Sequence, residues 1–424
     1  MSVSRRFAVG VPALVLALCL AFAPGVSVDA QAAADAEVCE QMTEDVMTQI
    51  GVNCAESDTG MICFASADVA AEFVSEGTDI VYREPGDTAE ANFLSALSVA
   101  AMDMEAESWG VNTLNLQANL PADFGTGARI IAFGGVDFES ATSADAVFEP
   151  LDKSITVETS ADTSLRAPVL GDPSDAEILA DLDAGTEVLA DAISADGRWV
   201  RVIADDTAGW LPAGAVDAIE RRDLPTYGSE ALTPLQAFHF RSSEADACST
   251  LSPGLLIQGH NDYPIDLIVN DMPIRIESTV FLRTRIDESN GQLIMDLFVL
   301  FGLARVNPGT DAEIIVPPGF SLSIFYNYQP GDFDINDLPN VTRAISFSNV
   351  LPLTREILDA LAFLLDIPRG ILFYFLELPI ISQPSGVGGV IIQIRFADPN
   401  AAAGANALCQ AGVLSDDICA ILGF

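Results

Sequence analysis

Basic residues are scarce in this sequence, and their scarcity limits the partners that the protein can have. The 424 residues include 61 aspartates and glutamates but only 19 lysines and arginines, and Lys153 is the one lysine. The resulting formal net charge of −42 repels the phosphates of nucleic acids and argues against a nucleic-acid partner. Because the acidic residues occur in every region, we interpret them as a solubilising surface that also binds divalent cations weakly.

The sequence also lacks the motifs of common hydrolases. It contains two histidines, His239 and His260, but no G-x-S-x-G nucleophile elbow, HExxH zinc motif or paired C-x-x-C motif. These absences argue against serine-hydrolase and zinc chemistry. Hydrolysis by two suitably spaced carboxylates needs no such motif and stays open as the enzymatic alternative.

The first 32 residues have the pattern of an export signal. Arg5 and Arg6 precede a long apolar run, and Ala30-Gln31-Ala32 matches an A-x-A cleavage site. We therefore predict a mature protein that begins at residue 33 and is secreted or associated with the cell surface. No transmembrane helix is expected after the signal is removed, because no later apolar stretch is long enough.

Cysteine usage agrees with export. Removal of the signal leaves an even number of cysteines, as disulfides require: Cys39, Cys54, Cys63, Cys248, Cys409 and Cys419. Three of them lie in residues 33–150, so at least one pairs with Cys248 or the C-terminal two unless one is a free thiol. The sequence leaves open whether Cys409 and Cys419 close a short loop or tie the tail to the body.

Residues 33–150 mix helix and strand patterns and are predicted to form an α+β domain. Val38, Met42, Val46 and Ile50 recur at four-residue spacing, which predicts a helix that ends at Gly51. Residues 89–104 are a second helix candidate. The segment from 109 to 139 alternates apolar and polar residues around a turn, which predicts strands.

Short strands separated by Gly, Asp and Pro turns fill residues 155–220. Four groups of residues follow one another there: Leu165, Arg166 and Pro168; Gly185, Thr186 and Val188; Trp199 and Val202; and Gly209 with Trp210. In this order they resemble the bacterial SH3 (SH3b) family, which implies a small β-barrel that recognises cell-wall peptides or surface proteins without catalysis. The segment departs from the family at Ala167, where glycine is usual, and in the long loop that follows.

Two tryptophans of this segment raise the question of a ligand site. If Val200 and Val202 face inward, Trp199 and Arg201 face the other way, because side chains alternate along a strand. We expect Trp210 in the core and Trp199 half-exposed. The candidate ligand contacts are therefore Trp199, Arg201 and Trp210, although the two rings in so small a domain are also explained as core.

Beyond a connector at 221–250, residues 251–335 form a second β-rich segment. It contains several strand patterns, and Asn290-Gly291 predicts a hairpin between two of them. A β-sandwich or roll is expected. The order of "STVFLRTR", "LIMDLFVLFGLARV" and "IIVPPG" in residues 251–328 is similar to the FecR-like β-domain of exported bacterial proteins.

The C-terminal segment, residues 336–424, is predicted to contain one amphipathic helix. Thr354 is a possible cap and Pro368 a stop, and one face carries Leu353, Ile357, Leu358, Leu361, Leu364 and Leu365. The apolar stretch 370–381 that follows is broken by Glu377 and Pro379. It predicts a buried element or a partner-facing patch rather than a membrane span.

One loop resembles a cation site in part. Asp332, Asp334 and Asn336 have the spacing of the first calcium-loop ligands, but Asp337 stands where the turn glycine belongs and Arg343 where the bidentate glutamate belongs. A polar loop is the favoured interpretation. No cofactor is predicted apart from weakly bound divalent cations.

These observations predict a mainly β, multidomain chain whose arrangement resembles that of secreted multidomain bacterial proteins. Its predicted function is non-catalytic binding or scaffolding in the cell envelope or extracellular space, with a cell-wall peptide or another surface protein as partner. Residues 151–217 hold fourteen acidic and four basic residues, a net charge of −10, so a neutral or cationic peptide is favoured over anionic polymers. The alternative, a secreted hydrolase, requires two carboxylates about 5–10 Å apart in a cleft.

Overall fold

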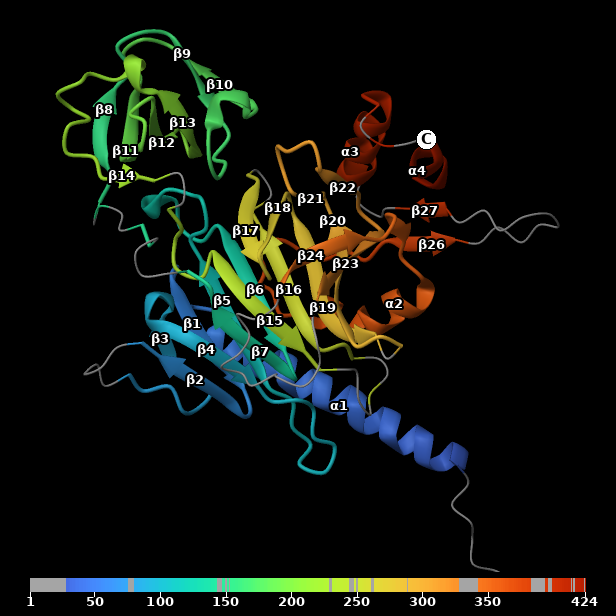
Figure 1. Cartoon of the computed structure of the whole chain (residues 1–424). Coiled ribbons are helices and arrows are strands. Elements are labelled where there is room, and N and C mark those ends of the chain that lie inside the picture. Colours follow the sequence, from blue (N-terminus) through green and yellow to red (C-terminus); the bar gives the residue numbers. More distant parts are fainter. Residues whose placement is uncertain are drawn as a thin grey trace, which may run out of the picture.

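A computed structural model shows two large β-sheets, a smaller β-domain and a few helices (Figure 1). The chain is mainly β, as predicted. The predicted export signal lies outside the described residues except for 28–32, which begin a helix. The described residues are 28–74, 80–142, 147–148, 151, 153–228, 231–243, 248, 251–260, 263–287, 289–327, 342–382, 393–395, 399–412, 414, 416–422 and 424.

The larger sheet, sheet A, is antiparallel. Its described strands follow the order β24-β23-β20-β19-β16-β6-β5-β1-β3, and β25 pairs with the start of β23. Their bounds are β1 (Met61–Ser66), β3 (Thr88–Glu90), β5 (Val111–Leu116), β6 (Ala128–Phe133), β16 (Gly254–Gly259), β19 (Thr279–Asp287), β20 (Gln292–Phe301), β23 (Phe320–Asn327), β24 (Thr342–Phe347) and β25 (Leu351–Pro352). Asn290 and Gly291 form the β19–β20 hairpin turn, as predicted.

Sheet B packs against one face of sheet A. Its order is β2-β4-β7-β15-β17-β18-β21-β22, and only the β15–β17 pair among these is parallel. The strands are β2 (Val69–Phe73), β4 (Leu94–Val99), β7 (Val136–Ser140), β15 (Ala237–Ser242), β17 (Ile265–Val269), β18 (Met272–Ile276), β21 (Ala304–Val306) and β22 (Ile314–Val316).

Both sheets take strands from segments that were predicted to be separate domains. Residues 61–140 and 237–327 contribute to each sheet, and they meet in sheet A where β6 pairs with β16 over six residues. The predicted connector, 221–250, includes β15, which lies inside sheet B. The two halves form one sandwich because each supplies hydrogen-bond partners to the strand edges of the other.

Sheet A is buried on both faces. In β6, Ile130 and Ala132 join the core shared with sheet B, whereas Ile131 and Phe133 face a second core that includes α1 (Val28–Cys54). Alternate residues of a strand point to opposite faces. The paired strands β6 and β16 in the middle of sheet A are therefore mostly apolar instead of alternating, and Arg129 and Gln258 are their polar residues.

The predicted helix at the N-terminus is present but longer than expected. Met42, Val46 and Ile50 of α1 are buried against sheet A, in agreement with their spacing. Gly51 does not end the helix, which continues to Cys54. A Cβ at Gly51 would lie 3.1 Å from the ring of Pro368, so this glycine allows close packing instead of terminating the helix.

The helix predicted at 89–104 is wrong. Residues 88–90 form β3, η1 (Ala91–Phe93) is a single 3-10 turn, and residues 94–99 form β4. Pairing of β4 with β2 and β7 overrides the local helical spacing.

The C-terminal segment has more helices than the one predicted. Thr354 caps α2 (Arg355–Ala360) as expected, because its hydroxyl accepts the Ile357 N–H at 3.3 Å. A 3-10 segment, η6 (Ala362–Asp366), then replaces the rest of the helix and leaves Leu365 exposed. The described remainder contains β26 (Ile380–Ser382), β27 (Gln393–Arg395), α3 (Pro399–Gln410) and α4 (Asp416–Leu422). Among the described residues, no helix combines the length and apolarity that crossing a membrane requires.

All six cysteines beyond residue 32 lie at disulfide distance from a partner. The pairs are Cys39–Cys248, Cys54–Cys63 and Cys409–Cys419, with Cα atoms 5.7–5.9 Å apart. One N-terminal cysteine therefore reaches Cys248, as the odd number in residues 33–150 predicted. The last pair closes a short loop between α3 and α4.

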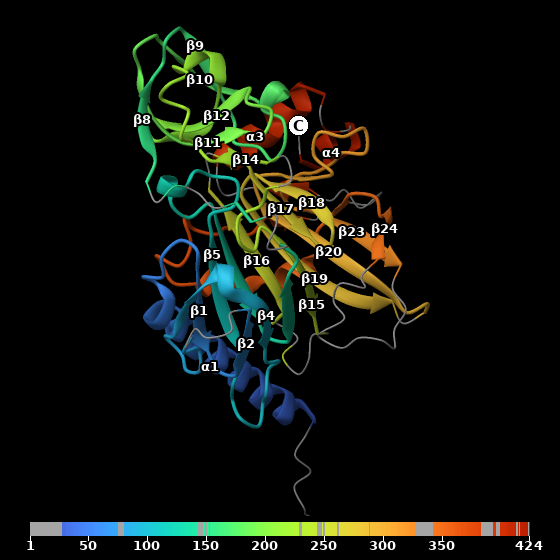
Figure 2. The same cartoon turned by 60° about the vertical axis from the view of Figure 1, so that its left-hand side comes forward.

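The smaller β-domain lies at one end of the sandwich, and Figures 1 and 2 show it there from two directions. Its strands follow the order β10-β9-β13-β12-β11-β14, and β8 also pairs with β11. They are β8 (Ile155–Glu158), β9 (Thr163–Arg166), β10 (Ile178–Leu182), β11 (Glu187–Ser194), β12 (Trp199–Ala204), β13 (Thr207–Pro212) and β14 (Thr226–Tyr227). Short 3-10 turns are η2 (Ala122–Phe124) before β6, η3 (Pro173–Asp175), and η4 (Ala213–Ala215) after β13.

Candidate functional site

The three predicted ligand contacts lie together on one face of the β12–β13 hairpin. Arg201 stands opposite Trp210 in the strand register, and Trp199 is two residues before Arg201 on the same strand. Val200 and Val202 point the other way, into the core of the small domain. We name the group on the outer face the aromatic–arginine cluster: Phe148, Asp191, Trp199, Arg201, Trp210 and Tyr227.

A buried ion pair forms the centre of the cluster. Arg201 donates from Nε and Nη2 to the two carboxylate oxygens of Asp191 at 2.8 and 2.7 Å, and both side chains are 0% exposed. A register shift between Ala190 and Ala192 places Asp191 in a bulge of β11 next to Arg201. Burial alone lowers the pKa of Arg201, but the charge and hydrogen bonds of Asp191 outweigh it and raise the pKa.

Two aromatic rings cover the guanidinium group. Its carbon lies 4.8 Å from the ring centre of Phe148 and 4.6 Å from that of Tyr227, within the range of cation–π attraction. Phe148 precedes the predicted SH3b-like segment, residues 155–220, and Tyr227 follows it in β14. The chain segments that connect the domain to the sandwich therefore supply the cover.

This cover corrects the prediction for Trp199. Trp199 is 9% exposed rather than half-exposed, and Trp210 is 2% exposed. Trp210 is buried as expected, but it packs in the aromatic–arginine cluster and not with Val200 in the domain core. The alternation of strand residues was predicted correctly, whereas the covering residues lie outside the strand pattern and were missed.

Four polar atoms of the cluster have no hydrogen-bond partner in the described part of the chain. They are Nε1 of Trp199, Nε1 of Trp210, Nη1 of Arg201 and the hydroxyl of Tyr227. Buried polar groups are usually paired, so four in one cluster are unusual. Three of them are N–H donors, which are suited to an oxygen acceptor such as a peptide carbonyl.

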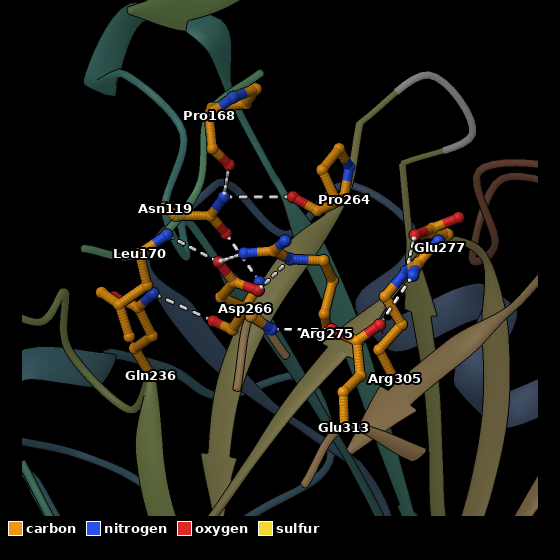
Figure 3. Close-up of polar contacts among 11 residues, drawn as sticks. Asn119, Pro168, Leu170, Gln236, Pro264, Asp266, Arg275, Glu277, Arg305 and Glu313 are labelled. Atoms are coloured by element: carbon orange, nitrogen blue, oxygen red, sulfur yellow. Dashed lines mark hydrogen bonds and ion pairs between the residues drawn. The ribbon is translucent and has the colours of Figure 1, made fainter. Parts of the chain in front are cut away.

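The small domain is fixed to sheet B by a second polar group, centred on Asp266 of β17 (Figure 3). One carboxylate oxygen of Asp266 accepts the Leu170 N–H at 2.6 Å, and Arg275 donates to both oxygens at 2.7 and 2.9 Å. Asn119 donates to the carbonyls of Pro168 and Pro264 and accepts the Asp266 N–H at 2.8 Å. The long loop after β9 thus docks on the sandwich.

Further contacts strengthen this junction. Tyr263 donates its hydroxyl proton to the carbonyl of Asp206, in the β12–β13 turn, at 2.8 Å. On the sandwich side of the junction, Gln236 donates to the Asp266 carbonyl at 2.9 Å, and Arg305 pairs with Glu277 and Glu313, both at 2.9 Å (Figure 3). Sequence reasoning did not find these residues, because they come from loops and strands far apart in the chain.

Both histidine side chains are packed against other parts of the fold. His239 is buried in β15 with Nε2 3.8 Å from a carboxylate oxygen of Asp271, and burial lowers its pKa despite this carboxylate. The His260 ring packs against the rings of Phe124, Tyr263 and Phe373 with centroids 5.2–5.8 Å away. His239 is therefore part of a buried strand, and His260 is part of a group of aromatic rings.

Metal binding is not supported in the described residues. Within them, no group of three or more His, Cys, Asp or Glu side chains is placed to hold an ion. The candidate ligands Asp332, Asp334 and Asn336 lie in 328–341, outside the described residues.

The chain was compared with protein-family models, with curated proteins and with solved structures, and none of the three comparisons gave a match. The resemblances of residues 155–220 to the SH3b family and of residues 251–328 to the FecR-like domain therefore stay predictions.

Proposed function

We propose that this protein is an exported, non-catalytic binding protein of the cell envelope or extracellular space, in which residues 155–220 are an SH3b-like recognition domain. The aromatic–arginine cluster is the observation that carries this proposal. Trp199, Arg201 and Trp210 share one face, and each has an N–H group without a partner among the described residues. Such donors beside aromatic rings suit a peptide, which presents carbonyl acceptors and side chains together.

Local geometry supports the SH3b-like assignment. The residues that carry the resemblance lie on β9, β11, β12 and β13 or in their turns. Gly209, of the Gly-Trp pair, lies where β13 passes β9, and a Cβ there would fall far inside contact distance of the Arg166 carbonyl. The close approach of β13 to β9 therefore requires a residue without a Cβ at this position.

The cysteine pairs support export. Disulfides persist in oxidising compartments and are rare in the cytosol, and three cysteine pairs lie at disulfide distance here. The net charge of −42 favours a neutral or cationic partner and disfavours anionic polymers unless divalent cations bridge the two surfaces.

The hydrolase alternative finds less support. Two clefts formed by described residues have volumes of about 470 and 220 Å³. The larger, near residues 98–101 and 284–286, is lined by a single acid, Asp137, which pairs with Arg241 at 2.6 Å. The smaller, within residues 364–376, is lined by no acid. Neither of these two clefts presents the pair of carboxylates that the reaction needs.

Co-sedimentation tests the proposal. The mature chain, residues 33–424, is mixed with peptidoglycan sacculi that have been stripped of anionic polymers, and with intact walls, each with and without millimolar calcium. We expect the protein to pellet with stripped sacculi and to pellet with intact walls mainly when calcium is present, because anionic polymers repel the acidic surface. Absence of pelleting in every condition would remove the wall as the partner.

A pair of variants locates the interaction. Trp199→Ala alters the aromatic–arginine cluster, and Phe375→Ala removes a ring that is 65% exposed on another part of the molecule. If the cluster recognises the peptide, Trp199→Ala reduces pelleting and Phe375→Ala does not, provided that circular dichroism shows both to be folded. Equal pelleting of the two variants would place recognition elsewhere.

A further inference from the structure

The edge of β11 in the small domain is shared by two short strands. β12 pairs along one side of β11. On the other side β8 pairs with Glu187–Ala190, and β14 pairs with Ile193 and Ser194. The second half of this edge is thus covered by only two residues, Thr226 and Tyr227, which lie beyond the predicted end of the SH3b-like segment at residue 220.

Backbone hydrogen bonds hold β14 to this edge. Ile193 donates its N–H to the carbonyl of Pro225 at 2.9 Å, and Ala195 donates to the carbonyl of Tyr227 at 3.0 Å. The pairing is parallel. An extended segment that adds to an exposed strand edge in this way is a general mode of peptide recognition, in which the main chain provides affinity and side chains provide selectivity.

The Tyr227 side chain reaches the aromatic–arginine cluster from this edge. Its ring lies over the Arg201 guanidinium at 4.6 Å and next to the Trp210 ring at 5.8 Å. Its hydroxyl is buried and has no partner among the described residues. The ring therefore fits the cluster well, whereas the polar atoms around it are incompletely paired.

Phe148 completes the cover from the other connecting segment. Its ring lies 4.8 Å from both the Arg201 guanidinium and the Tyr227 ring. Its N–H donates to the carbonyl of Leu232 at 2.9 Å, beside a bridge between Val147 and Leu232. Phe148 thus lies outside the seven-stranded sheet of the small domain, and Tyr227 lies in its two-residue strand β14, so both covering rings are carried by short segments.

We infer that the edge of β11 at Ile193–Ala195 is a strand-addition site which the chain occupies with its own residues 226–227, and that the partner it fits is an extended peptide carrying an aromatic side chain. The inference rests on the proposed function and specifies its ligand. A peptide pairing with Ile193 and Ala195 places its ring where that of Tyr227 now lies, over Arg201 and next to Trp210. The net charge of −10 on residues 151–217 favours a neutral or cationic peptide.

Displacement of the chain's own segment is the expected signature of this site. The peptide RDLPTYG, which copies residues 222–228, is labelled and titrated into the full mature chain, with binding followed by fluorescence anisotropy. We expect weak binding to the unaltered protein, because its own segment competes, and binding at least roughly tenfold tighter to Tyr227→Ala, in which the competing ring is absent. The control peptide RDLPTAG should bind neither protein measurably.

Phe375→Ala serves as the matched control variant, because it removes an exposed ring away from β11 and should bind RDLPTYG as the unaltered protein does. Tyr227→Leu is the second test variant and is used where Tyr227→Ala does not fold; it should also tighten binding, because it too lacks the competing ring. Unchanged affinity in every folded cover variant, or equal binding of RDLPTYG and RDLPTAG, would overturn the inference. Pelleting with sacculi that persists in that case would leave the proposed function standing with a different site.

Discussion

At the scale of single residues, Arg201 shows how a charged group is accommodated in a small domain. Removing a guanidinium group from water costs free energy, which hydrogen bonds and an opposite charge have to offset. Asp191 supplies both in a bidentate pair, and Phe148 and Tyr227 add contacts with their rings. Loss of either partner would therefore leave the other charge buried without compensation.

A double-mutant cycle tests this dependence. Arg201→Leu should lower the free energy of unfolding by about 3–5 kcal/mol, because Asp191 remains buried without the guanidinium. The double variant Asp191→Leu, Arg201→Leu should regain much of the loss, since no unpaired charge is left. Urea unfolding measures both values. The comparison variant is Arg198→Leu, because the Arg198 side chain is 59% exposed beside Asp172. This substitution should lower the free energy of unfolding by about 1 kcal/mol or less. Equal losses for Arg198→Leu and Arg201→Leu would contradict the dependence on burial.

His239 gives the molecule an acid-sensitive group in β15. Because its pKa is lowered in the folded state, the unfolded chain binds more protons as the pH falls below the ordinary histidine value of 6.5. The stability that depends on neutral His239 is present above pH 6.5 and is lost as the pH falls toward the lowered pKa. Urea midpoints at pH 7.0 and pH 5.5 should therefore differ less in His239→Gln than in the unaltered protein. An identical pH dependence of the two proteins would show that His239 is not the group responsible.

At the scale of elements, the small domain depends on close approach between β9 and β13. Gly209→Ala should destabilise the protein by about 1–3 kcal/mol, because a methyl group cannot fit against the Arg166 carbonyl. Gly214 in η4 is the matched control: it is exposed, and a Cβ there meets no atom within 4 Å. Gly214→Ala should change stability by about 0.5 kcal/mol or less. Thermal unfolding distinguishes the two, and a Gly209→Ala midpoint equal to that of the control would refute the steric account.

The elements also show where sequence patterns suffice and where they fail. Strands at 163–212 and 265–326 were predicted because alternation and turn residues there are local properties. Residues 89–104 were assigned to a helix because Leu94, Leu97 and the small residues around them fit helical spacing as well as strand alternation. Only pairing with β2 and β7 settles the choice, and that pairing joins residues distant in sequence.

The candidate site was predictable only in part for the same reason. Trp199, Arg201 and Trp210 could be placed on one face from alternation and hairpin register alone. Phe148 and Tyr227 could not be added, because they lie outside the strands that define the pattern. Asp191 was missed because a bulge, which has no local signature here, turns it toward Arg201.

At the scale of the whole molecule, the Cys39–Cys248 pair connects α1 to the segment before β16. It closes a loop of 209 residues, whereas Cys409–Cys419 closes one of 10. By the chain-entropy estimate the long loop restricts the unfolded chain by about 5 kcal/mol and the short one by about 3 kcal/mol. Cys39→Ser with Cys248→Ser should therefore lower the thermal midpoint more than Cys409→Ser with Cys419→Ser. The reverse order in calorimetry would contradict this estimate.

The position of the small domain in the chain has a consequence for how such a protein can be assembled genetically. β7 and β15 are hydrogen-bonded neighbours in sheet B, and everything from residue 141 to 236 lies between their ends. Val147 and Leu232 bridge one another at the base of this insertion. The sandwich therefore keeps its strand order whether the two strands are joined by a tight turn or by an entire domain. Replacement of the small domain at this one loop would leave the strand order of the sandwich unchanged, and it would remove the partners that Pro168 and Leu170 supply to Asn119 and Asp266.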